Sequence, residues 1–392
     1  MDVDEAKRVA REEIDRLTPD LLQVSHSIHA NPELDFEEHY AHELLTGVLE
    51  DFGIAVTRGA YELPTAFEAT IGVEGMPTVA LLCEYGALPG LGHAVGHNVV
   101  AAASLGAGLA VSRIVDALGG RIVILGTPAE LAGGGKELMR RRGAFDDVDL
   151  AMMVHPADRE ALGMQTLAAQ RLRVTYIGEP ADAAAAPEHG HNALDAAVLG
   201  YQAVGALRQH IGANERVHGV FVDGGGRANV VPATASTEWY VRSTDSSSLD
   251  LLKDRVWLCL QGGADAAACE LVGEWIDPAL DEMYVNQALI DLYAKNAADI
   301  GRHPLSIDDS DPITSSSDLG NISHHVPALN PVIQIAPQGT PLHTPAFADA
   351  AKSEGGDSGV IDGAVMLAYT AIDCLASKYN RAAIRGVFQG TA

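Results

Sequence analysis

Short apolar strands that alternate with helices constrain the fold of this chain most strongly. Three apolar runs, Thr78–Cys83, Arg121–Gly126 and 150–154, follow one another with helical segments between them. Strands whose apolar residues are consecutive rather than alternate are typical of sheets buried on both faces. The pattern therefore predicts an α/β fold with a mainly parallel sheet and helices on both of its faces.

A different pattern occupies the middle of the chain. From about Leu167, strands of alternating polarity are accompanied by two helical segments, 192–210 and 249–262. This block predicts an α+β domain with helices on one side of an antiparallel sheet. We expect an α/β domain formed by residues 1–168 and 281–392, with an α+β domain inserted as residues 169–280.

Charge and cysteine content narrow the function classes. The formal net charge is −27, and such a surface repels nucleic acid and anionic membranes, both of which require basic residues. No apolar run reaches the roughly 18 residues that span a bilayer. The four cysteines are scattered, which indicates free thiols in a reducing compartment. We therefore expect a cytoplasmic protein without nucleic-acid or membrane partners.

Polar residues directly follow the predicted buried strands. Ligands of open parallel sheets bind at the carboxyl ends of the strands, where such residues gather. Imidazoles are the commonest metal ligands, and glutamate can serve as a general base. The residues supplied by these segments, together with one near the C-terminus, are His93, His97, Glu130, His155 and His343.

At these positions the sequence resembles a known family. Residues 83–98, C-E-Y-G-A-L-P-G-L-G-H-A-V-G-H-N, are similar to C-E-Y-D-A-L-P-G-I-G-H-A-C-G-H-N of the metallopeptidase-like amidohydrolases. That branch contains aminoacylases, indole-acetyl-amino-acid hydrolases and p-aminobenzoyl-glutamate hydrolases. Residues 127–136, T-P-A-E-L-A-G-G-G-K, resemble its T-P-A-E-E-G-G-G-G-K segment. Further matches run in order at 27–38, 144–156, 190–197, 216–220, 227–232 and 315–323.

The resemblance implies a two-metal hydrolytic mechanism. In the family, two divalent ions share a bridging thiolate and a bridging water, and a glutamate takes the water's proton. His97 matches a ligand of the first metal, and His155 and His343 match ligands of the second. Glu130 matches the general base, and Asp318 matches an acidic position near the site.

The resemblance also implies a substrate and an assembly. Asn229 and Arg242 fall where the family's inserted domain meets the polar end of the substrate, and His218 matches a position that faces the partner subunit's site. Arginine binds carboxylates bidentately, so we expect a small substrate with an acyl or aromatic part and a carboxylate. A homodimer formed through the inserted domain is expected.

Four positions depart from the family pattern. Val95 stands where the bridging cysteine belongs, and Leu131 replaces a glutamate ligand. Gly86 replaces an aspartate that orients a ligand histidine, and Asp182 replaces a histidine that stabilises the oxyanion. Valine and leucine offer no lone pair. We therefore expect either no metal or one weakly bound zinc or manganese ion on the neutral imidazoles of His97, His155 and His343.

These losses leave three functions open. The first is metal-poor or metal-free acid–base chemistry by Glu130 and the histidines, including an elimination, isomerisation or cyclisation. For this reading, the apolar replacements should raise the pKa of Glu130 and lower those of the histidines. The second is a residual single-metal amide or dipeptide hydrolase, in which His189 and His191 partly replace the lost oxyanion donor. The third is an inactive protein that binds a ligand.

Overall fold

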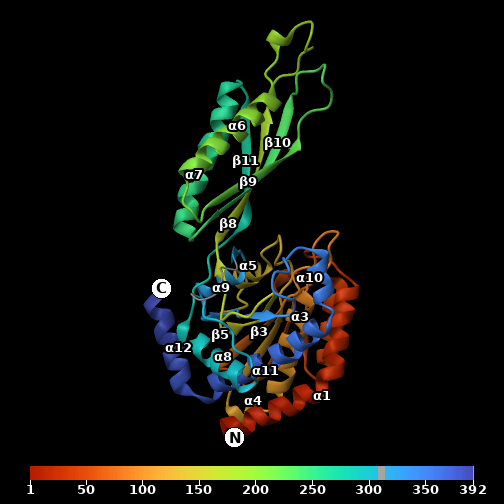
Figure 1. Ribbon diagram of the computed structural model, residues 1–392, viewed down its shortest axis with the longest axis vertical. Coiled ribbons are helices and arrows are strands. Elements are labelled where there is room, and N and C mark those ends of the chain that lie inside the picture. Colours follow the sequence, from red (N-terminus) through yellow and green to blue (C-terminus); the bar gives the residue numbers. More distant parts are fainter. Residues whose placement is uncertain (308–313, 392) are drawn as a thin grey trace. The chain divides into compact units, whose positions relative to one another are not determined.

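The structure, a computed structural model, describes residues 1–307 and 314–391. The chain divides into two compact units. The larger unit combines Met1–Gln165 with Met283–Ala392, and the inserted unit is Thr166–Glu282. Figure 1 shows the chain coloured from the N-terminus to the C-terminus.

A six-stranded sheet forms the centre of the larger unit, with strand order β1-β2-β4-β3-β5-β13. The four strands β4, β3, β5 and β13 run parallel to one another, whereas β2 is antiparallel to β4 and β1 is antiparallel to β2 at one edge of the sheet. The carboxyl ends of the parallel strands therefore meet at one edge of the sheet. The strands are β1 (Val56–Arg58), β2 (Phe67–Gly72), β3 (Thr78–Cys83), β4 (Arg121–Gly126), β5 (Leu150–Met152) and β13 (Ala328–Leu329).

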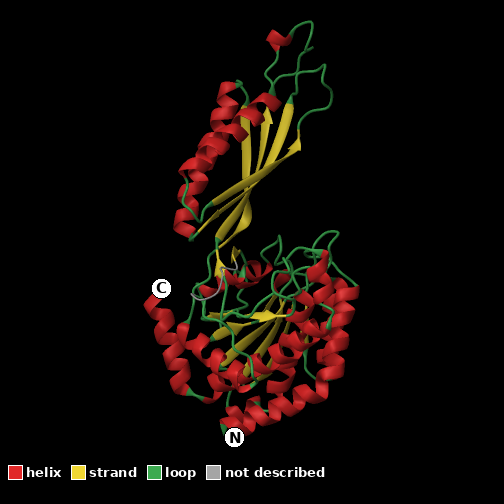
Figure 2. Cartoon of the chain, viewed as in Figure 1, coloured by secondary structure: helices red, strands yellow, loops and turns green. Residues whose placement is uncertain are grey.

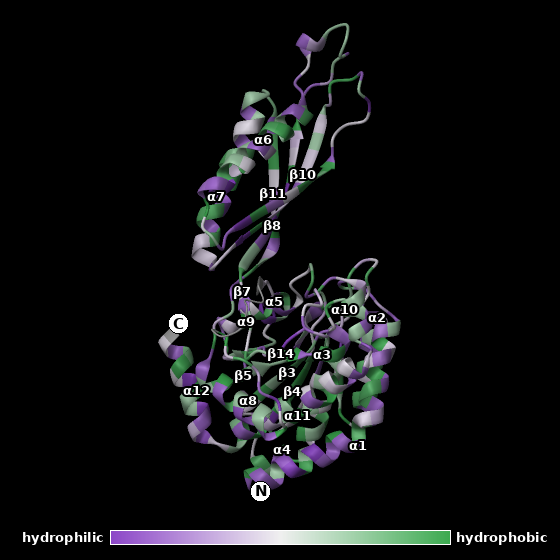
Figure 3. Ribbon diagram, in the orientation of Figure 1, coloured by the Kyte–Doolittle hydropathy of each residue, from purple (hydrophilic) through white to green (hydrophobic). Residues whose placement is uncertain are grey.

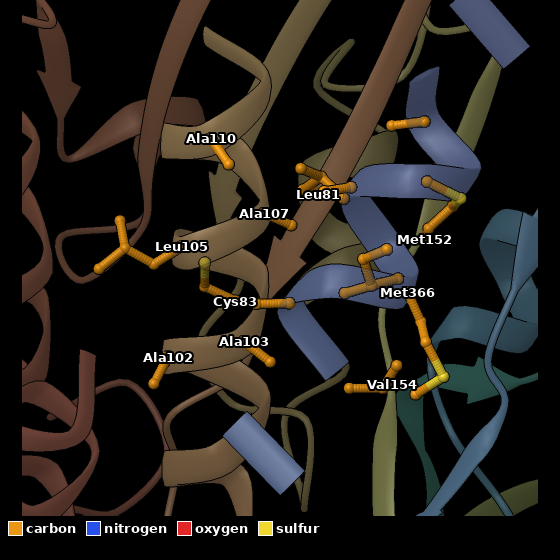
Figure 4. Close-up of a cluster of buried hydrophobic side chains, with 14 of the residues drawn as sticks. Leu81, Cys83, Ala102, Ala103, Leu105, Ala107, Ala110, Met152, Val154 and Met366 are labelled. Atoms are coloured by element: carbon orange, nitrogen blue, oxygen red, sulfur yellow. The ribbon is translucent and has the colours of Figure 1, made fainter. Parts of the chain in front are cut away.

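Side chains of the central strand β3 are buried on both faces of this sheet. Leu81 and Cys83 point into one hydrophobic cluster, and Ala80 and Leu82 point into another. Figure 4 shows the first cluster, in which small residues such as Ala103 let a helix approach the sheet closely. Consecutive apolar residues are therefore required in β3, because alternate residues enter different cores.

Helices cover both faces of the larger sheet (Figure 2). α1 (Val3–Ala30), α3 (His97–Ser112) and α11 (Glu354–Ala376) pack together in the first cluster, and α5 (Gly135–Arg140) and α9 (Leu319–Ser323) lie in the second. Figure 3 shows hydrophobic residues in the strands and a mixture of polar and apolar residues along α1. This mixture is the amphipathic pattern that predicted α1.

Shorter elements complete the larger unit. Two small sheets pair β6 with β14 and β7 with β12. The bounds are α2 (His39–Asp51), η1 (Ala60–Glu62), α4 (Val115–Leu118), β6 (His155–Ala157), β7 (Gln165–Thr166), α8 (Gln287–Asp299), β12 (Thr314–Ser315), β14 (Val332–Gln334), α10 (Pro345–Ala350) and α12 (Lys378–Thr391).

The inserted unit is an antiparallel sheet with two long helices on one face. Its strand order is β11-β8-β10-β9, which leaves β11 and β9 as edge strands. Trp239 is buried between the sheet and the helices. The elements are β8 (Ala168–Ile177), η2 (Pro187–His189), α6 (Ala193–Leu207), η3 (Arg208–His210), β9 (Arg216–Asp223), β10 (Thr234–Ser243), α7 (Ser246–Ala266) and β11 (Glu270–Leu280).

The predicted α/β fold class is confirmed, with differences at element boundaries. α2 begins only at His39, because Phe36 has a φ of 64°, which a right-handed helix excludes. The strand expected over 150–154 ends at Met152 as β5, and β6 begins at His155 and pairs with a different strand. α11 begins at Glu354, where the Ser353 side chain accepts a hydrogen bond from Gly355 N.

One helix, α11, is long and apolar enough to cross a membrane by length and composition alone. In the structure, 78% of its most apolar stretch is buried. It packs against α1, α3 and α8, so it serves as a core helix of the larger unit.

Candidate active site and metal centre

Three polar side chains of the site follow parallel strands. Glu84 follows β3, Glu130 lies in the loop after β4, and His155 opens β6 shortly after β5. Because these strands run in parallel, their carboxyl ends bring the three residues to one edge of the sheet. His97 joins them as the first residue of α3.

Gly96 sets the position of His97. Its φ of 83° is a left-handed conformation that glycine adopts without strain. A Cβ atom at this position would lie 2.9 Å from Cβ of Pro156, the residue after His155. The glycine therefore lets the N-terminus of α3 approach β6, and the rings of His97 and His155 lie 6.1 Å apart and perpendicular to each other.

Glu84, His97 and His155 form a group suited to a metal ion. Each is buried, and one ligand atom from each lies within 4.8 Å of the others. His97 Nδ1 lies 2.8 Å from the Gly86 carbonyl oxygen, whereas its Nε2 makes no hydrogen bond with the residues that the structure describes. Glu84 Oε2 is 3.5 Å from that Nε2 and likewise makes no hydrogen bond within residues 1–307 and 314–391. A carboxylate with two histidines is a ligand set of catalytic zinc sites.

A buried ammonium group lies beside this set. Lys136 Nζ is 2.5 Å from Glu84 Oε1, and it donates a hydrogen bond to Asp318 Oδ1 at 2.6 Å. The backbone N–H of Lys136 donates to the second oxygen of Asp318 at 2.8 Å. Burial by itself would lower the pKa of Lys136, but the two carboxylates raise it above its ordinary value. The group is therefore a fixed positive charge in the site.

Glu130 occupies the same cluster. Its Oε2 lies 3.7 Å from His97 Nε2, and its side chain is 11% exposed. The preceding residue, Ala129, has a φ of 58°, and its N–H donates to Glu38 Oε1 at 2.7 Å. Glu38 also accepts from the Thr65 hydroxyl. This buried carboxylate holds the loop that carries Glu130, which explains why the opening motif at 27–38 belongs to the site.

Burial and neighbouring charges shift the pKa values in the expected directions. Desolvation, followed by the Glu84 and Asp318 carboxylates, raises the pKa of Glu130 well above its ordinary value. Desolvation lowers the pKa of His97 to about 4 and also lowers that of His155. At neutral pH these two imidazoles are neutral and offer a lone pair.

The two-metal centre of the family does not fit these residues. Val95 is buried and Leu131 carries an aliphatic side chain, so neither can donate to an ion. At Gly86, where the family has an orienting aspartate, the backbone carbonyl oxygen itself orients His97. A Cβ atom there would lie 3.3 Å from Glu38 Oε1. A site for one divalent cation at Glu84, His97 and His155 does fit.

His343 is not among the residues whose ligand atoms gather within 4.8 Å of one another. Besides burial, its charge is nevertheless one of the influences that lower the pKa of His155. Its side chain is exposed, its N–H donates to the Ala94 carbonyl oxygen, and its φ is 61°. Such backbone strain in a non-glycine residue occurs most often at functional sites. The role of His343 as a ligand stays a prediction.

Two predicted residues of the inserted unit come together around Tyr240. The Arg242 guanidinium lies 4.3 Å from the centre of the Tyr240 ring, and the His218 ring stacks on the same ring at 5.9 Å. His218 and Tyr240 are paired across β9 and β10. Burial, and then the Arg242 charge, lower the pKa of His218.

Asp182 and Asn229 lie in a second group in the same unit. Asp182 pairs with Val230 through an isolated bridge, and Ala183 N donates to the Asn229 carbonyl oxygen at 3.1 Å. The Asp182 carboxylate accepts hydrogen bonds from the N–H groups of Ala184 and Ala185. In this unit Asp182 therefore shapes a turn of the loop.

Sequence reasoning missed two central residues, Glu84 and Lys136. The expectation that only neutral imidazoles remain as possible ligands left out Glu84, whose carboxylate lies beside His97 and His155. The signal was available, since Glu84 is the first polar residue after the buried strand β3. The position of Lys136 depends on Asp318, which is 182 residues away along the chain.

Comparison with known proteins identifies the family of the chain. No family model matches the chain. Mouse (Mus musculus) Xaa-Arg dipeptidase is 34% identical, with 97% of this chain and 91% of that protein covered. One of the p-aminobenzoyl-glutamate hydrolase polypeptides of Escherichia coli (strain K12) is 35% identical over 62% of this chain and 54% of that protein.

Solved structures share the fold. An aminobenzoyl-glutamate utilization protein from Klebsiella pneumoniae has a TM-score of 0.70 at 21% identity, covering 89% of this chain and 97% of that one. A dinuclear-metal-binding peptidase of the M20 family from Bacillus subtilis has a TM-score of 0.68 at 18% identity, covering 92% and 99%. The expected family and enzyme class are confirmed. The chain belongs to the metallopeptidase-like amidohydrolase family, together with the Xaa-Arg dipeptidases and p-aminobenzoyl-glutamate hydrolases, and it is an enzyme of that amidohydrolase type.

Proposed function

We propose that this enzyme hydrolyses the amide bond between a small acyl or aminoacyl group and an amino acid with a free carboxylate. The observation that carries this proposal is the position of Glu130, 3.7 Å from His97 at the carboxyl edge of the sheet. The relatives act on substrates of this kind by name, as a Xaa-Arg dipeptidase and a p-aminobenzoyl-glutamate hydrolase.

Glu130 moves the proton in this reaction. Its raised pKa suits a carboxyl group that takes a proton from water and then delivers it to the leaving amine. Glu38 keeps the Glu130 loop in place through Ala129. When bound, a divalent cation lowers the pKa of water and polarises the amide carbonyl. Glu84, His97 and His155 would hold such an ion.

A second candidate is metal-free acid–base chemistry, such as an elimination, isomerisation or cyclisation. Lys136 favours it, because a fixed ammonium group already compensates part of the negative charge of Glu84 and Asp318. Prolonged treatment with a chelator separates the two functions, since it abolishes metal-assisted hydrolysis and leaves metal-free turnover intact.

The carboxylate of the substrate is assigned to the inserted unit. Arg242 offers a planar guanidinium for bidentate contact, and its stacking on Tyr240 holds it in one orientation. Asn229 is proposed as a second polar contact. His218 and Asp182 remain proposed neighbours of the substrate.

A homodimer through the inserted unit is proposed from its edge strand β9. Val220 and Val222 are 62% and 61% exposed on this strand, next to backbone groups without a neighbouring strand. Exposed apolar edge strands are natural pairing surfaces. A second copy of β9 would pair with the backbone groups of this edge strand and would also cover Val220 and Val222. The free cysteines support the proposed cytoplasmic location.

Activity of the Glu130→Gln variant tests the proposed function. Dipeptides and p-aminobenzoyl-glutamate are incubated with the protein, and release of the amino acid is measured. Loss of the proton-transfer group should reduce kcat by roughly 10²- to 10⁴-fold with little change in KM. Glu137→Gln, a change at a buried glutamate paired with Arg140 and Arg141, is the matched control. Undiminished turnover by Glu130→Gln would exclude the proposed role.

A further inference from the structure

We propose that this enzyme carries a one-metal centre in which Glu84, His97 and His155 hold a single divalent cation. Glu84 takes over the anionic role that the family gives to residues replaced here by Val95 and Leu131. The inference deepens the proposed function and rests on it for what the ion does, but the ligand set follows from this chain's own geometry.

One ligand atom from each of the three side chains lies within 4.8 Å of the other two. Nδ1 of His97 faces the Gly86 carbonyl oxygen, and Nδ1 of His155 faces the Pro156 carbonyl oxygen at 3.0 Å. Each carbonyl accepts only from a protonated Nδ1, so the tautomer is fixed and Nε2 keeps its lone pair. Nε2 of His97 is fully buried and has no hydrogen-bond partner in the described part of the chain. A buried nitrogen of this kind is costly unless a ligand satisfies it.

Lys136 fixes the orientation of Glu84. The Lys136 ammonium group pairs with Oε1 of Glu84, and the other carboxylate oxygen, Oε2, lies 3.5 Å from Nε2 of His97. Asp318 in turn holds Lys136 through both its Nζ and its backbone N–H. The carboxylate therefore presents one oxygen to the histidines before any ion arrives, which lowers the ordering cost of binding.

The charges of the cluster set the number of ions. Glu84, Glu130 and Asp318 bring ligand oxygens within 4.8 Å of one another, and Lys136 lies against two of these carboxylates. Even with all three carboxylates ionised, one ammonium group leaves two uncompensated negative charges. One divalent cation neutralises them, whereas a second would leave a buried excess of positive charge. In the family, the positions of Val95 and Leu131 carry two anionic ligands. Their loss here removes about as much negative charge as one divalent ion would balance.

Metal binding to the Glu84→Gln variant tests this centre directly. Apo-protein prepared with a chelator is titrated with Zn²⁺ or Mn²⁺ by calorimetry, and bound metal is counted after dialysis. Wild-type protein should bind one equivalent. Glu84→Gln should bind more than about 100-fold more weakly, beyond the usual cost of losing a ligand-orienting group. Glu137→Gln, which changes another buried glutamate that pairs with Arg140 and Arg141, should bind like the wild type.

His155→Gln provides an independent variant, because it leaves the buried Glu84–Lys136 pair intact. This charge pair should keep the variant folded. His155→Gln should lose affinity as Glu84→Gln does. Two equivalents in the wild type, or wild-type affinity in both folded variants, would overturn the one-metal centre. One equivalent that is lost in these variants, together with no amide hydrolysis, would reject the proposed function and leave the centre standing.

Discussion

At the scale of single residues, the site depends on charges that few positions can supply. Glu84 and Lys136 are fully buried and lie 2.5 Å apart, and Lys136 also pairs with Asp318. Buried charges are stable only in such pairs, because removing one partner leaves the other desolvated and unpaired. The pair is therefore both a structural element and part of the site.

Replacing Lys136 by methionine should expose this dependence. The variant leaves two carboxylates without their cation, so we expect the free energy of unfolding to fall by about 3–5 kcal/mol. Added Zn²⁺ or Mn²⁺ should recover part of this loss, because the unbalanced carboxylates then attract the ion more strongly. Thermal unfolding with and without metal measures both effects.

Lys7→Met is the matched control for that experiment. Lys7 is also buried, and it pairs with Asp373 at 2.8 Å and with Asn296, far from the histidines in sequence. The Lys7→Met variant should lose a similar amount of unfolding free energy, and added metal should not restore it. Equal recovery in both variants, or none in Lys136→Met, would contradict the proposed link between Lys136 and the ion.

The sequence predicted individual site residues unevenly. Glu130, His97 and His155 were predicted because they follow strands and match family motifs, and the structure brings them together. Glu84 was missed because the sequence was compared with the family motif for differences, such as Val95 and Leu131, and Glu84 is the same as in the motif. Lys136 was missed because its partners come from β3 and from the N-terminus of α9, a contact that no local pattern encodes.

At the scale of elements, most helices and strands could be predicted, but their ends could not. Periodicity determines that α1 and β3 exist, because it determines which faces can be buried. Ends depend on local details, such as the Ser353 cap of α11 and the positive φ of Phe36 before α2. The division of the strand at 150–157 depends on two separate partners, β13 and β14.

The edge strand β9 gives a prediction at this scale. Replacing both Val220 and Val222 by aspartate places like charges where two copies of the strand would meet, so the proposed homodimer should dissociate. Size-exclusion chromatography with light scattering reports the mass. Leu251→Asp, on the exposed side of α7, should leave the dimer intact. A monomeric wild type would refute the proposed assembly.

At the scale of the whole molecule, buried histidines couple stability to pH. His93 is buried, with Nε2 3.0 Å from the Ile28 carbonyl oxygen, and desolvation lowers its pKa to about 3. In the unfolded chain His93 binds a proton below about pH 6.5, whereas in the folded chain the His93 imidazole stays neutral until the pH is much lower. The stabilising contribution is therefore complete above pH 6.5 and is lost as the pH falls toward 3.

His93→Gln should remove this dependence. When the pH falls from 7.5 to 5, protonation of His93 in the unfolded chain lowers the free energy of unfolding of the wild type by about 2 kcal/mol. The variant lacks this residue and does not show this loss. The stability difference between the two proteins should therefore shrink by this amount on acidification. Urea denaturation at the two pH values measures it, with His39→Gln at an exposed histidine as the comparison. A constant difference would show that His93 does not titrate as described.

X-ray diffraction at the absorption edge of a bound metal tests the central claim most directly. Crystals of the metal-loaded protein should give one anomalous peak in the larger unit, within bonding distance of Glu84, His97 and His155. Two peaks, or a single peak that lacks Glu84 as a ligand, would contradict a centre rebuilt around that carboxylate.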